Sequence, residues 1–316
     1  MRPEAVAVRP LGEDDLPEAD RIFRLAFGTH LGLPEPLAFG GDRELVRGRW
    51  RADPTAALAA ELDGALVGSN FAANWGSFAY FGPLSVRPDL WNQGVAQRLL
   101  DATMALFSKW GPSHLGLYTL VNSPKHLALY QKYGFWPRFL THLMSRPVRP
   151  ERPVPPYALF STGGAAERES CLAACREVTG AIYDGLDVSR EVRAVQEQKL
   201  GDTVLLWDTS RLAGFAVCHC GGGTEAGSDV CYVKFAAVSP GPSAATVFDR
   251  LLAACEAFAA QRGLGQLVCG VNLARHEAYR ALLAAGFRIE SQGVAMQRPN
   301  EAGFNRPGVY VIDDWR

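Results

Sequence analysis

The chain has 316 residues and a formal net charge of −1, from 32 basic and 33 acidic side chains. Hydrophobic residues make up 48% and charged residues 21%, which is typical of a globular protein. At about 150 residues per domain, this length predicts two domains. The balanced charge argues against a nucleic-acid partner. The sequence contains no run of about 18 apolar residues, so we expect no membrane span. The N-terminal sequence lacks a signal peptide's apolar core, so we expect a cytoplasmic protein.

The sequence contains seven cysteines, an odd number that favours free thiols over a disulfide framework. Cys218 and Cys220 flank His219, but alternation along a strand would place the histidine on the opposite face. We therefore expect small buried side chains here and no metal site.

An internal repeat relates the two halves of the chain, because the identical residues found between Val86 and Pro147 recur at one constant offset of 152 residues, with no gap. Gly134-Phe135 matches Gly286-Phe287, and Arg146-Pro147 matches Arg298-Pro299. A period of this size excludes a solenoid of short repeats. The proline-rich segment 146–156 predicts a stiff linker. We therefore predict two domains of one fold, over residues 1–150 and 151–316.

Hydrophobic periodicity predicts the elements in chain order. In the first domain we expect strands over 5–9, 57–62, 65–74, 78–86, 115–121 and 135–145, and helices over 13–27, 44–50, 95–110 and 124–133. Asp63-Gly64 is a favoured two-residue hairpin turn. In the second domain we expect strands over 157–160, 203–207, 212–219, 231–238, 267–271 and 288–297, and helices over 167–179, 191–200, 244–262 and 277–284. A glycine-rich loop over 221–227 is extra in the second domain. This order predicts an α/β (α+β) sandwich in each domain, with a mostly antiparallel mixed sheet flanked by helices.

The segment from Leu84 to Leu100 carries the clearest chemical signal. A predicted strand ends at Val86, a short loop follows, and a helix begins with Gly94 and Ala96 at its start. Small residues let a ligand approach the backbone, and the first turn of a helix offers unpaired N–H groups to an anion. The pattern therefore suits a pyrophosphate, although helix capping explains such a glycine about as often.

This pattern resembles the coenzyme A loop of the GCN5-related N-acetyltransferase family, which reads Gln/Arg-x-x-Gly-x-Gly/Ala. Gly94 and Ala96 match its last two positions, whereas Trp91 stands where Gln or Arg is usual. The family's later motif Leu-Tyr-x-x-x-Gly-Phe is similar to the segment from Leu129 to Phe135. The resemblance extends over both halves and implies two tandem acyl-CoA N-acyltransferase-like domains.

The resemblance implies an acetyl-CoA-dependent N-acetyltransferase in which a primary amine attacks acetyl-CoA, the co-substrate, directly. Tyr130 falls on the family's general-acid position, where a phenol stays protonated at neutral pH. Its alternative role is a half-buried helix aromatic. The implied cofactor contacts are Leu84, Ser85, Val86, Asn92, Gln93, Gly94, Val95, Ala96, Gln97, Asn122 and Tyr130. Asn122 is equally well suited to capping the next helix. Lys125 and His126 either reach cofactor phosphates or are solvated.

The general base is harder to place, because the predicted strands 78–86 and 114–121 contain no Asp or Glu. Glu61, the loop between the first two helices and the other domain are possible sources of a carboxylate. His114 and Tyr80 are candidates by residue type, and a water relay without a single base is also open.

The repeat predicts which domain is active. The offset maps Gly94 to Thr246, Ala96 to Phe248, Tyr130 to Leu282 and Asn122 to Ala274. A bulky loop residue obstructs the backbone's approach to a pyrophosphate. We therefore expect the N-terminal domain to bind acetyl-CoA and the C-terminal domain to be degenerate, supporting the fold.

Some features stay open at this level. The acceptor is a small-molecule or peptide amine, and the chain is either a monomer with a pseudo-dimer of domains or a weak homodimer. The alternative function is a non-catalytic acyl-CoA-binding sensor or an interaction protein. Residues 309–313 predict a seventh strand, which we expect to be shared or exchanged between the domains.

Overall fold

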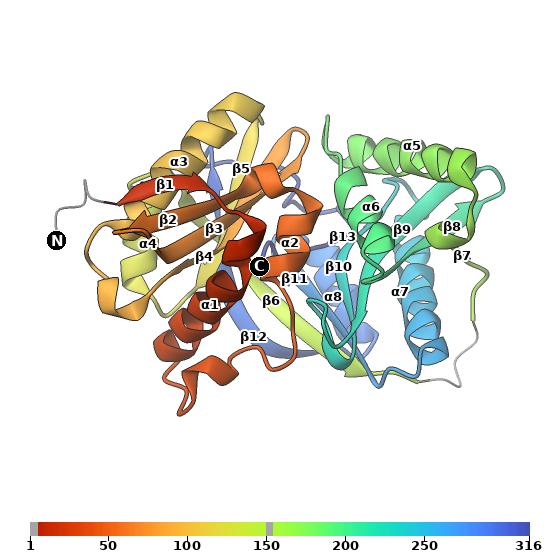
Figure 1. Ribbon diagram of the computed structural model, residues 1–316. Helices are drawn as coiled ribbons and strands as arrows, with labels where there is room; N and C mark the ends of the chain where they lie inside the picture. Colours follow the sequence, from red (N-terminus) through yellow and green to blue (C-terminus); the bar gives the residue numbers. More distant parts are fainter. Residues whose placement is uncertain (1–5, 150–153) are drawn as a thin grey trace.

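The computed structural model describes residues 6–149 and 154–316 (Figure 1). The start of the first predicted strand and the middle of the predicted linker lie outside the described residues. The first half contains β1 (Ala7–Pro10), α1 (Leu16–His30), α2 (Val46–Ala52), β2 (Ala57–Leu62), β3 (Ala65–Trp75), β4 (Phe78–Val86), α3 (Val95–Trp110), β5 (His114–Leu120), α4 (Pro124–Gln131) and β6 (Trp136–Pro147).

The second half follows the same order and adds one strand. Its elements are β7 (Ala158–Leu159), α5 (Ala165–Ile182), α6 (Ser189–Glu197), β8 (Gly201–Asp208), β9 (Arg211–Gly221), β10 (Gly227–Val238), α7 (Ala244–Gln261), β11 (Gln266–Asn272), α8 (His276–Ala284), β12 (Arg288–Arg298) and β13 (Val311–Ile312).

The strands of the two halves join into one 13-stranded sheet, in the order β1-β2-β3-β4-β5-β12-β6-β11-β10-β9-β8-β7, with β13 paired to β10. The pairs β4–β5 and β10–β11 are parallel and the other ladders are antiparallel, which confirms the predicted mixed, mostly antiparallel fold class. The hairpin prediction is also confirmed, because Asp63 and Gly64 both have the positive φ of a type I′ turn.

The last strand of each half's repeat lies in the other half's part of the sheet. β12 lies between β5 and β6, where Val294 is the partner of Thr119 on one side and Leu140 on the other. β6 in turn pairs with β11, where Cys269 is the partner of Met144. Figure 1 shows β12, in blue, beside the yellow strands of the first half.

Two expectations about this region were wrong. The exchanged strands are β6 and β12, whereas β13 pairs within its own half, with Val311 opposite Ala237. The predicted linker also begins later than expected, because Arg146 belongs to β6, opposite Leu267. A proline is tolerated at the end of a strand, so Pro147 can close β6 without disturbing the ladder.

An aromatic cluster holds the two halves together. The ring of Trp75 in β3 lies 5.3 Å from that of Phe235 in β10, and the ring of Phe78 lies 4.7 Å from that of Trp315. All four residues are buried. Aromatic side chains bury large apolar areas, so this contact makes the halves interdependent.

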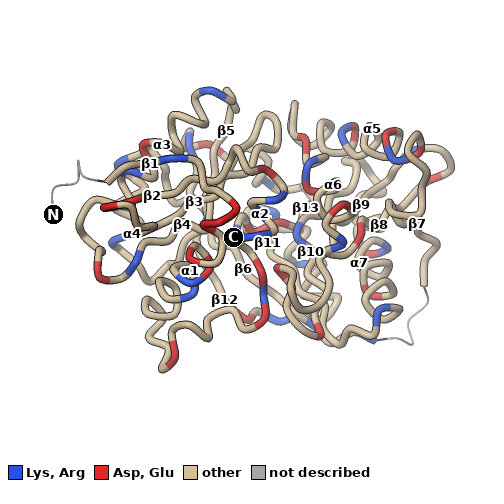
Figure 2. The backbone as a smooth tube through the Cα atoms, in the orientation of Figure 1, with Lys and Arg blue, Asp and Glu red and all other residues tan. Residues whose placement is uncertain are grey.

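Charged side chains of both signs are intermixed over both halves (Figure 2), in keeping with the near-zero net charge. All seven cysteines are free thiols, as predicted. Over residues 6–149 and 154–316, no helix combines the length and the apolar character that crossing a membrane requires.

Candidate functional site

The site that the sequence predicts lies where β4 and β5 separate. These strands pair in parallel from Phe78 opposite His114 to Phe81 opposite Leu117, and their ladder ends there. β4 continues to Val86 while still paired to β3, with Leu84 opposite Asn70. Leu84, Ser85 and Val86 therefore lie beyond the end of the β4–β5 ladder, along one side of a wedge between the two strands.

The loop after β4 opens into α3 through two left-handed residues, Asn92 and Gly94, with φ of 64° and 87°. The first backbone bond of α3 runs from the N–H of Arg98 to the carbonyl of Gly94. The N–H groups of the preceding residues, Val95 to Gln97, belong to the first turn and have no carbonyl within the helix to bond. The end of the helix and its dipole thus face the loop, as an anion site requires.

Trp91 connects this loop to β4 and α4. Its indole N–H donates to the carbonyl of Val86 over 2.8 Å, so it ties the loop to the end of β4. The ammonium of Lys125 lies 5.5 Å from the centre of the Trp91 ring, which brings the start of α4 beside the loop. Gln93 donates to the carbonyl of Asp89 within the same loop. Trp91 therefore has a structural contact of its own at the position where the resemblance implies Gln or Arg.

Tyr130, near the end of α4, is buried against β4. Its ring lies 5.7 Å from that of Phe81, the residue at which the β4–β5 ladder ends, and 6.3 Å from that of His126. Burial raises the pKa of the phenol well above its ordinary value, so Tyr130 stays protonated at neutral pH. Burial also lowers the pKa of His126 to about 4, helped by the nearby charges of His30 and Lys125, so this imidazole is neutral.

Two further residues that the sequence implies as cofactor contacts, Asn122 after β5 and Gln97 in α3, have different surroundings. Asn122 follows β5 and is exposed, and the residue at the N-cap of α4 is Ser123. Its neighbour thus occupies the N-cap position, but the Ser123 side chain makes no capping hydrogen bond, and its hydroxyl lies 2.8 Å from Nδ1 of His126. The carbonyl of Gln97 accepts from the hydroxyl of Tyr133, which ties α3 to the end of α4.

The base candidates named from the sequence lie away from the wedge or are poor bases. His114 begins β5, three residues or about 10 Å along the strand from Leu117, where the ladder to β4 ends, at about 3.3 Å per residue. Its Nε2 lies 2.8 Å from Oε1 of Gln297, and burial lowers its pKa. Glu61 in β2 forms an ion pair with Arg9 of the edge strand. Tyr80 is buried in β4, and burial raises its pKa well above the ordinary value.

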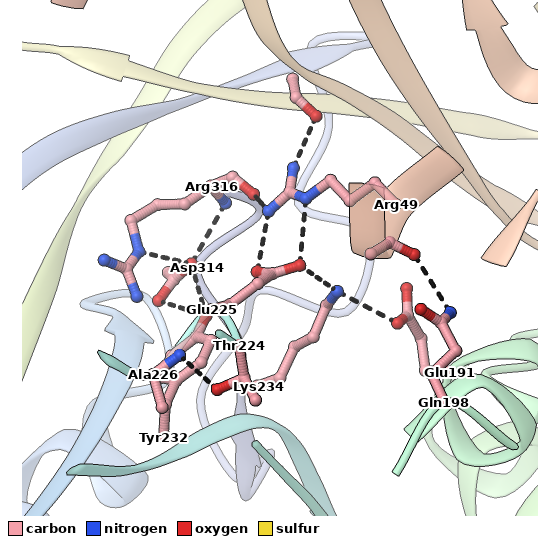
Figure 3. A network of polar contacts seen from close by, with 12 residues as sticks. Arg49, Glu191, Gln198, Thr224, Glu225, Ala226, Tyr232, Lys234, Asp314 and Arg316 are labelled. Carbon is pink, nitrogen blue, oxygen red and sulfur yellow. Dashed lines mark hydrogen bonds and ion pairs between the residues drawn. The ribbon is translucent and has the colours of Figure 1, made fainter. Parts of the chain in front are cut away.

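A charged network that sequence reasoning missed joins the two halves (Figure 3) and contacts β4 at the carbonyl of Gly82. Arg49 of α2 pairs with Glu225, which also binds Lys234 of β10. Lys234 in turn pairs with Glu191 of α6. The glycine-rich loop that carries Glu225 stood out in the sequence as an extra segment. Nothing in the sequence indicated its partner in the other half.

A narrow cavity of about 30 Å³ lies beside this network, between α2, β4 and α6. Tyr80 and Gly82 line it from the first half. From the second half His219 lines it, and Nδ1 of His219 has no hydrogen-bond partner within the described residues. Burial and the nearby Lys234 lower the pKa of His219 to about 4, so it is neutral.

The matching wedge of the second half is filled by the chain itself. β10 and β11 pair in parallel from Val230 to Val233, and beyond that point β13 pairs with Ala236 and Ala237. The ring of Phe248, which the repeat aligns with Ala96, lies 5.2 Å from that of Tyr310 just before β13. The corresponding space is therefore occupied by the C-terminal segment.

Comparisons with known proteins agree with this geometry. Residues 22–135 match the model of the Acetyltransferase (GNAT) family. No curated protein matches the sequence. A candidate acetyltransferase from Pyrococcus horikoshii is similar in structure, with a TM-score of 0.71 and 14% identity over 99% of this chain and 95% of that one. A GCN5-related N-acetyltransferase from Sphaerobacter thermophilus has a TM-score of 0.59 and 15% identity over 94% and 96% of the two chains.

A third structure, the GCN5-related N-acetyltransferase from Anabaena variabilis, has a TM-score of 0.55 and 13% identity over 93% of this chain and 72% of that one. At these identities the likeness shows a shared fold. The family match covers α1 to the start of β6, which includes the wedge, the loop and Tyr130. The stretch that matches the GNAT family model, residues 22–135, therefore carries the candidate site.

Proposed function

We propose that this protein transfers an acetyl group from acetyl-CoA to a primary amine, using the site in residues 1–150. The observation that carries the proposal is the meeting of three features at one place. The wedge beyond Phe81, the α3 N-terminus at Gly94 and the buried phenol of Tyr130 lie together in the first half. Together they suit a ligand that has an extended arm, a pyrophosphate and a thioester.

The backbone of the loop and of β4 would bind the co-substrate. The N–H groups from Gln93 to Gln97 would take the pyrophosphate, because the positive end of the helix dipole favours an anion. Asn92 and Gly94 provide the left-handed turns that expose this backbone. The strand end from Leu84 to Val86 would hydrogen-bond the pantetheine arm in the manner of a ladder partner.

Tyr130 would act as the general acid. The amine attacks the thioester carbonyl, the carbon–sulfur bond breaks, and Tyr130 donates its proton to the departing thiolate. Because burial raises the pKa of Tyr130, the phenol holds this proton through the neutral range. The amine must lose a proton too, and a water relay is the simplest route because neither Tyr80 nor His114 is suited to accept it.

We also propose that the halves over 1–150 and 151–316 are diverged copies and that the second is degenerate. The repeat aligns Tyr130 with Leu282 and Gly94 with Thr246, and β13 takes the place of a pantetheine arm beside β10. The second half would therefore act as a scaffold for the first.

The test is release of free coenzyme A from acetyl-CoA by the purified protein with a panel of primary amines. We expect turnover by the wild-type protein, none by Gly94→Trp, and wild-type turnover by Thr246→Trp, which changes the aligned exposed residue. Loss of turnover in Thr246→Trp alone would assign activity to the second half. Tight binding of acetyl-CoA with no turnover for any amine would identify a sensor instead.

A further inference from the structure

The carbonyl of Gly82 lies at the point where β4 separates from β5 and where its ladder with β3 is interrupted by a shift of register. The ladder to β5 ends at Phe81, and the ladder to β3 shifts register between Phe81 and Leu84. Pro83, the next residue, has no N–H to donate. Sheet pairing therefore fixes the course of β4 only weakly at the point where the proposed thioester site begins.

Arg49 supplies a hydrogen bond at this point. Its guanidinium donates to the carbonyl of Gly82 over 2.5 Å, and also to the carbonyl of Arg316. Arg49 belongs to α2 and lines the narrow cavity beside Gly82 together with Tyr80. Its side chain is only 9% exposed, so this contact is shielded from competing water.

The second half determines where that guanidinium lies. Glu225 accepts from Nε and Nη2 of Arg49 over 3.1 and 3.0 Å, in the paired geometry that orients a guanidinium plane. Lys234 lies 2.8 Å from the same carboxylate and 3.2 Å from that of Glu191. Glu191 also accepts from the indole N–H of Trp75. Figure 3 shows this run of alternating charges.

The loop that carries Glu225 is fixed to the segment before α2. The N–H of Glu44 donates to the carbonyl of Thr224, and the N–H of Gly223 donates to that of Asp42, each over 3.0 Å. A Cβ on Gly222 would lie only 2.4 Å from a carboxylate oxygen of Asp42, so a larger residue there would displace the Asp42 side chain. The extra glycine-rich loop is therefore a bridge between the halves.

We propose that Arg49, oriented by Glu225 from the second half, is a positioning residue that sets the course of β4 at Gly82. The second half thereby completes the acetyl-CoA site of the first without contacting the co-substrate. This inference rests on the proposed function for its effect on acetyl-CoA, but its effect on β4 is measurable in the protein alone. Lysine cannot replace Arg49, because a single ammonium cannot reach the two carboxylate oxygens and the carbonyl of Gly82 in one plane.

The first experiment measures amide hydrogen exchange in the segment 78–86 of the full-length protein without ligand. Arg49→Lys and Glu225→Gln should each raise the exchange rate of this segment by about tenfold, because losing hydrogen bonds to charged groups frees the strand. Arg146→Lys is the matched control, since Arg146 forms an equally buried ion pair with Glu256 that does not involve β4. Unchanged exchange in both variants, or equal exchange in the control, would overturn the inference.

The second experiment measures acetyl-CoA binding by calorimetry for the same proteins. Arg49→Lys and Glu225→Gln should weaken the Kd by about tenfold relative to Arg146→Lys, and adding Arg49→Lys to Glu225→Gln should weaken it little further. Wild-type affinity in both variants would overturn the positioning role. If the wild-type protein binds no acetyl-CoA but Arg49→Lys and Glu225→Gln still exchange faster in the segment 78–86, the proposed function is refuted. The control of β4 by Arg49 is then upheld.

Discussion

Leu120 of the first half and Gly293 of the second half are partners in one ladder, and Gly293 is also the partner of Thr141 in the next ladder. The second half thus completes the part of the sheet that carries the candidate site. A Cβ on Gly293 would lie 2.2 Å from the Tyr118 ring, so the aromatic side chain of β5 packs directly on the inserted strand.

This strand exchange predicts that the full chain unfolds in one cooperative transition. Chains longer than about 150 residues often unfold domain by domain, but here, over the described residues, β6 has ladders only with strands of the second half, and β12 lies between β5 and β6 of the first half. Differential scanning calorimetry should therefore give a single peak whose calorimetric and van't Hoff enthalpies agree. Two separable peaks would contradict the mutual dependence of the halves.

The C-terminal segment should matter for the first half as well as the second. Trp315 packs against Phe78, and its ring lies 2.9 Å from where a Cβ on Gly116 would be. Trp315→Ala should lower the free energy of unfolding by about 3–5 kcal/mol, as expected for a large buried aromatic.

Deleting residues 309–316 should also abolish turnover. Full activity of the truncated chain would contradict the packing of this segment against the site.

Tyr130→Phe should lower kcat by roughly 10²–10⁴-fold with little change in the KM for acetyl-CoA, because it removes a proton donor and little volume. The control is Tyr133→Phe in the next turn, whose hydroxyl bonds Gln97 and Asp101 instead. Because burial raises the pKa of Tyr130, activity should not decline through titration of this phenol up to pH 10. Equal kcat for both variants would remove Tyr130 from the chemistry.

His219 should make stability depend on pH on the acid side. Its pKa is about 4 in the folded protein and 6.5 ordinarily, so the unfolded chain binds the proton more readily. The contribution of neutral His219 to the free energy of unfolding is fully present above pH 6.5. It is lost as the pH falls through about 4, which lowers the free energy of unfolding by about 3 kcal/mol. His219→Gln should flatten the pH dependence of urea unfolding between pH 6.5 and 4. The exposed His276 gives the matched control variant His276→Gln, and a flattening as large as that of His219→Gln would remove the effect from His219.

Local signals in the sequence predicted most elements of the fold. β4 and α3 begin and end at the expected residues, 78–86 and 95–110. Proline or glycine lies just outside each end of these elements, and both residues favour the end of a strand or helix. The sequence also predicted the loop at Gly94 between β4 and α3 and the helix that carries Tyr130. These features depend on neighbouring residues and on a motif of fixed spacing.

The interactions between the halves could not be predicted in the same way. Arg49 and Glu225 are far apart in the sequence and carry no motif, so only the folded chain brings them together. The exchange of β6 and β12 is equally hidden, because each strand has the same alternating pattern whichever partner it meets. For the same reason the expected exchange of the strand in 309–313 was wrong, because β13 forms there but pairs with β10 of its own half.

The most direct test of the account is the number of acetyl-CoA molecules that one chain binds, measured by isothermal titration calorimetry. We predict one site per chain, lost in Ala96→Phe, which places in the first half the residue that the second half has at Phe248. The matched variant Thr246→Trp, at an exposed position of α7, should keep one site with the wild-type Kd. Two sites per chain, or a site that survives Ala96→Phe and disappears in Thr246→Trp, would contradict the assignment of the cofactor site to the N-terminal half.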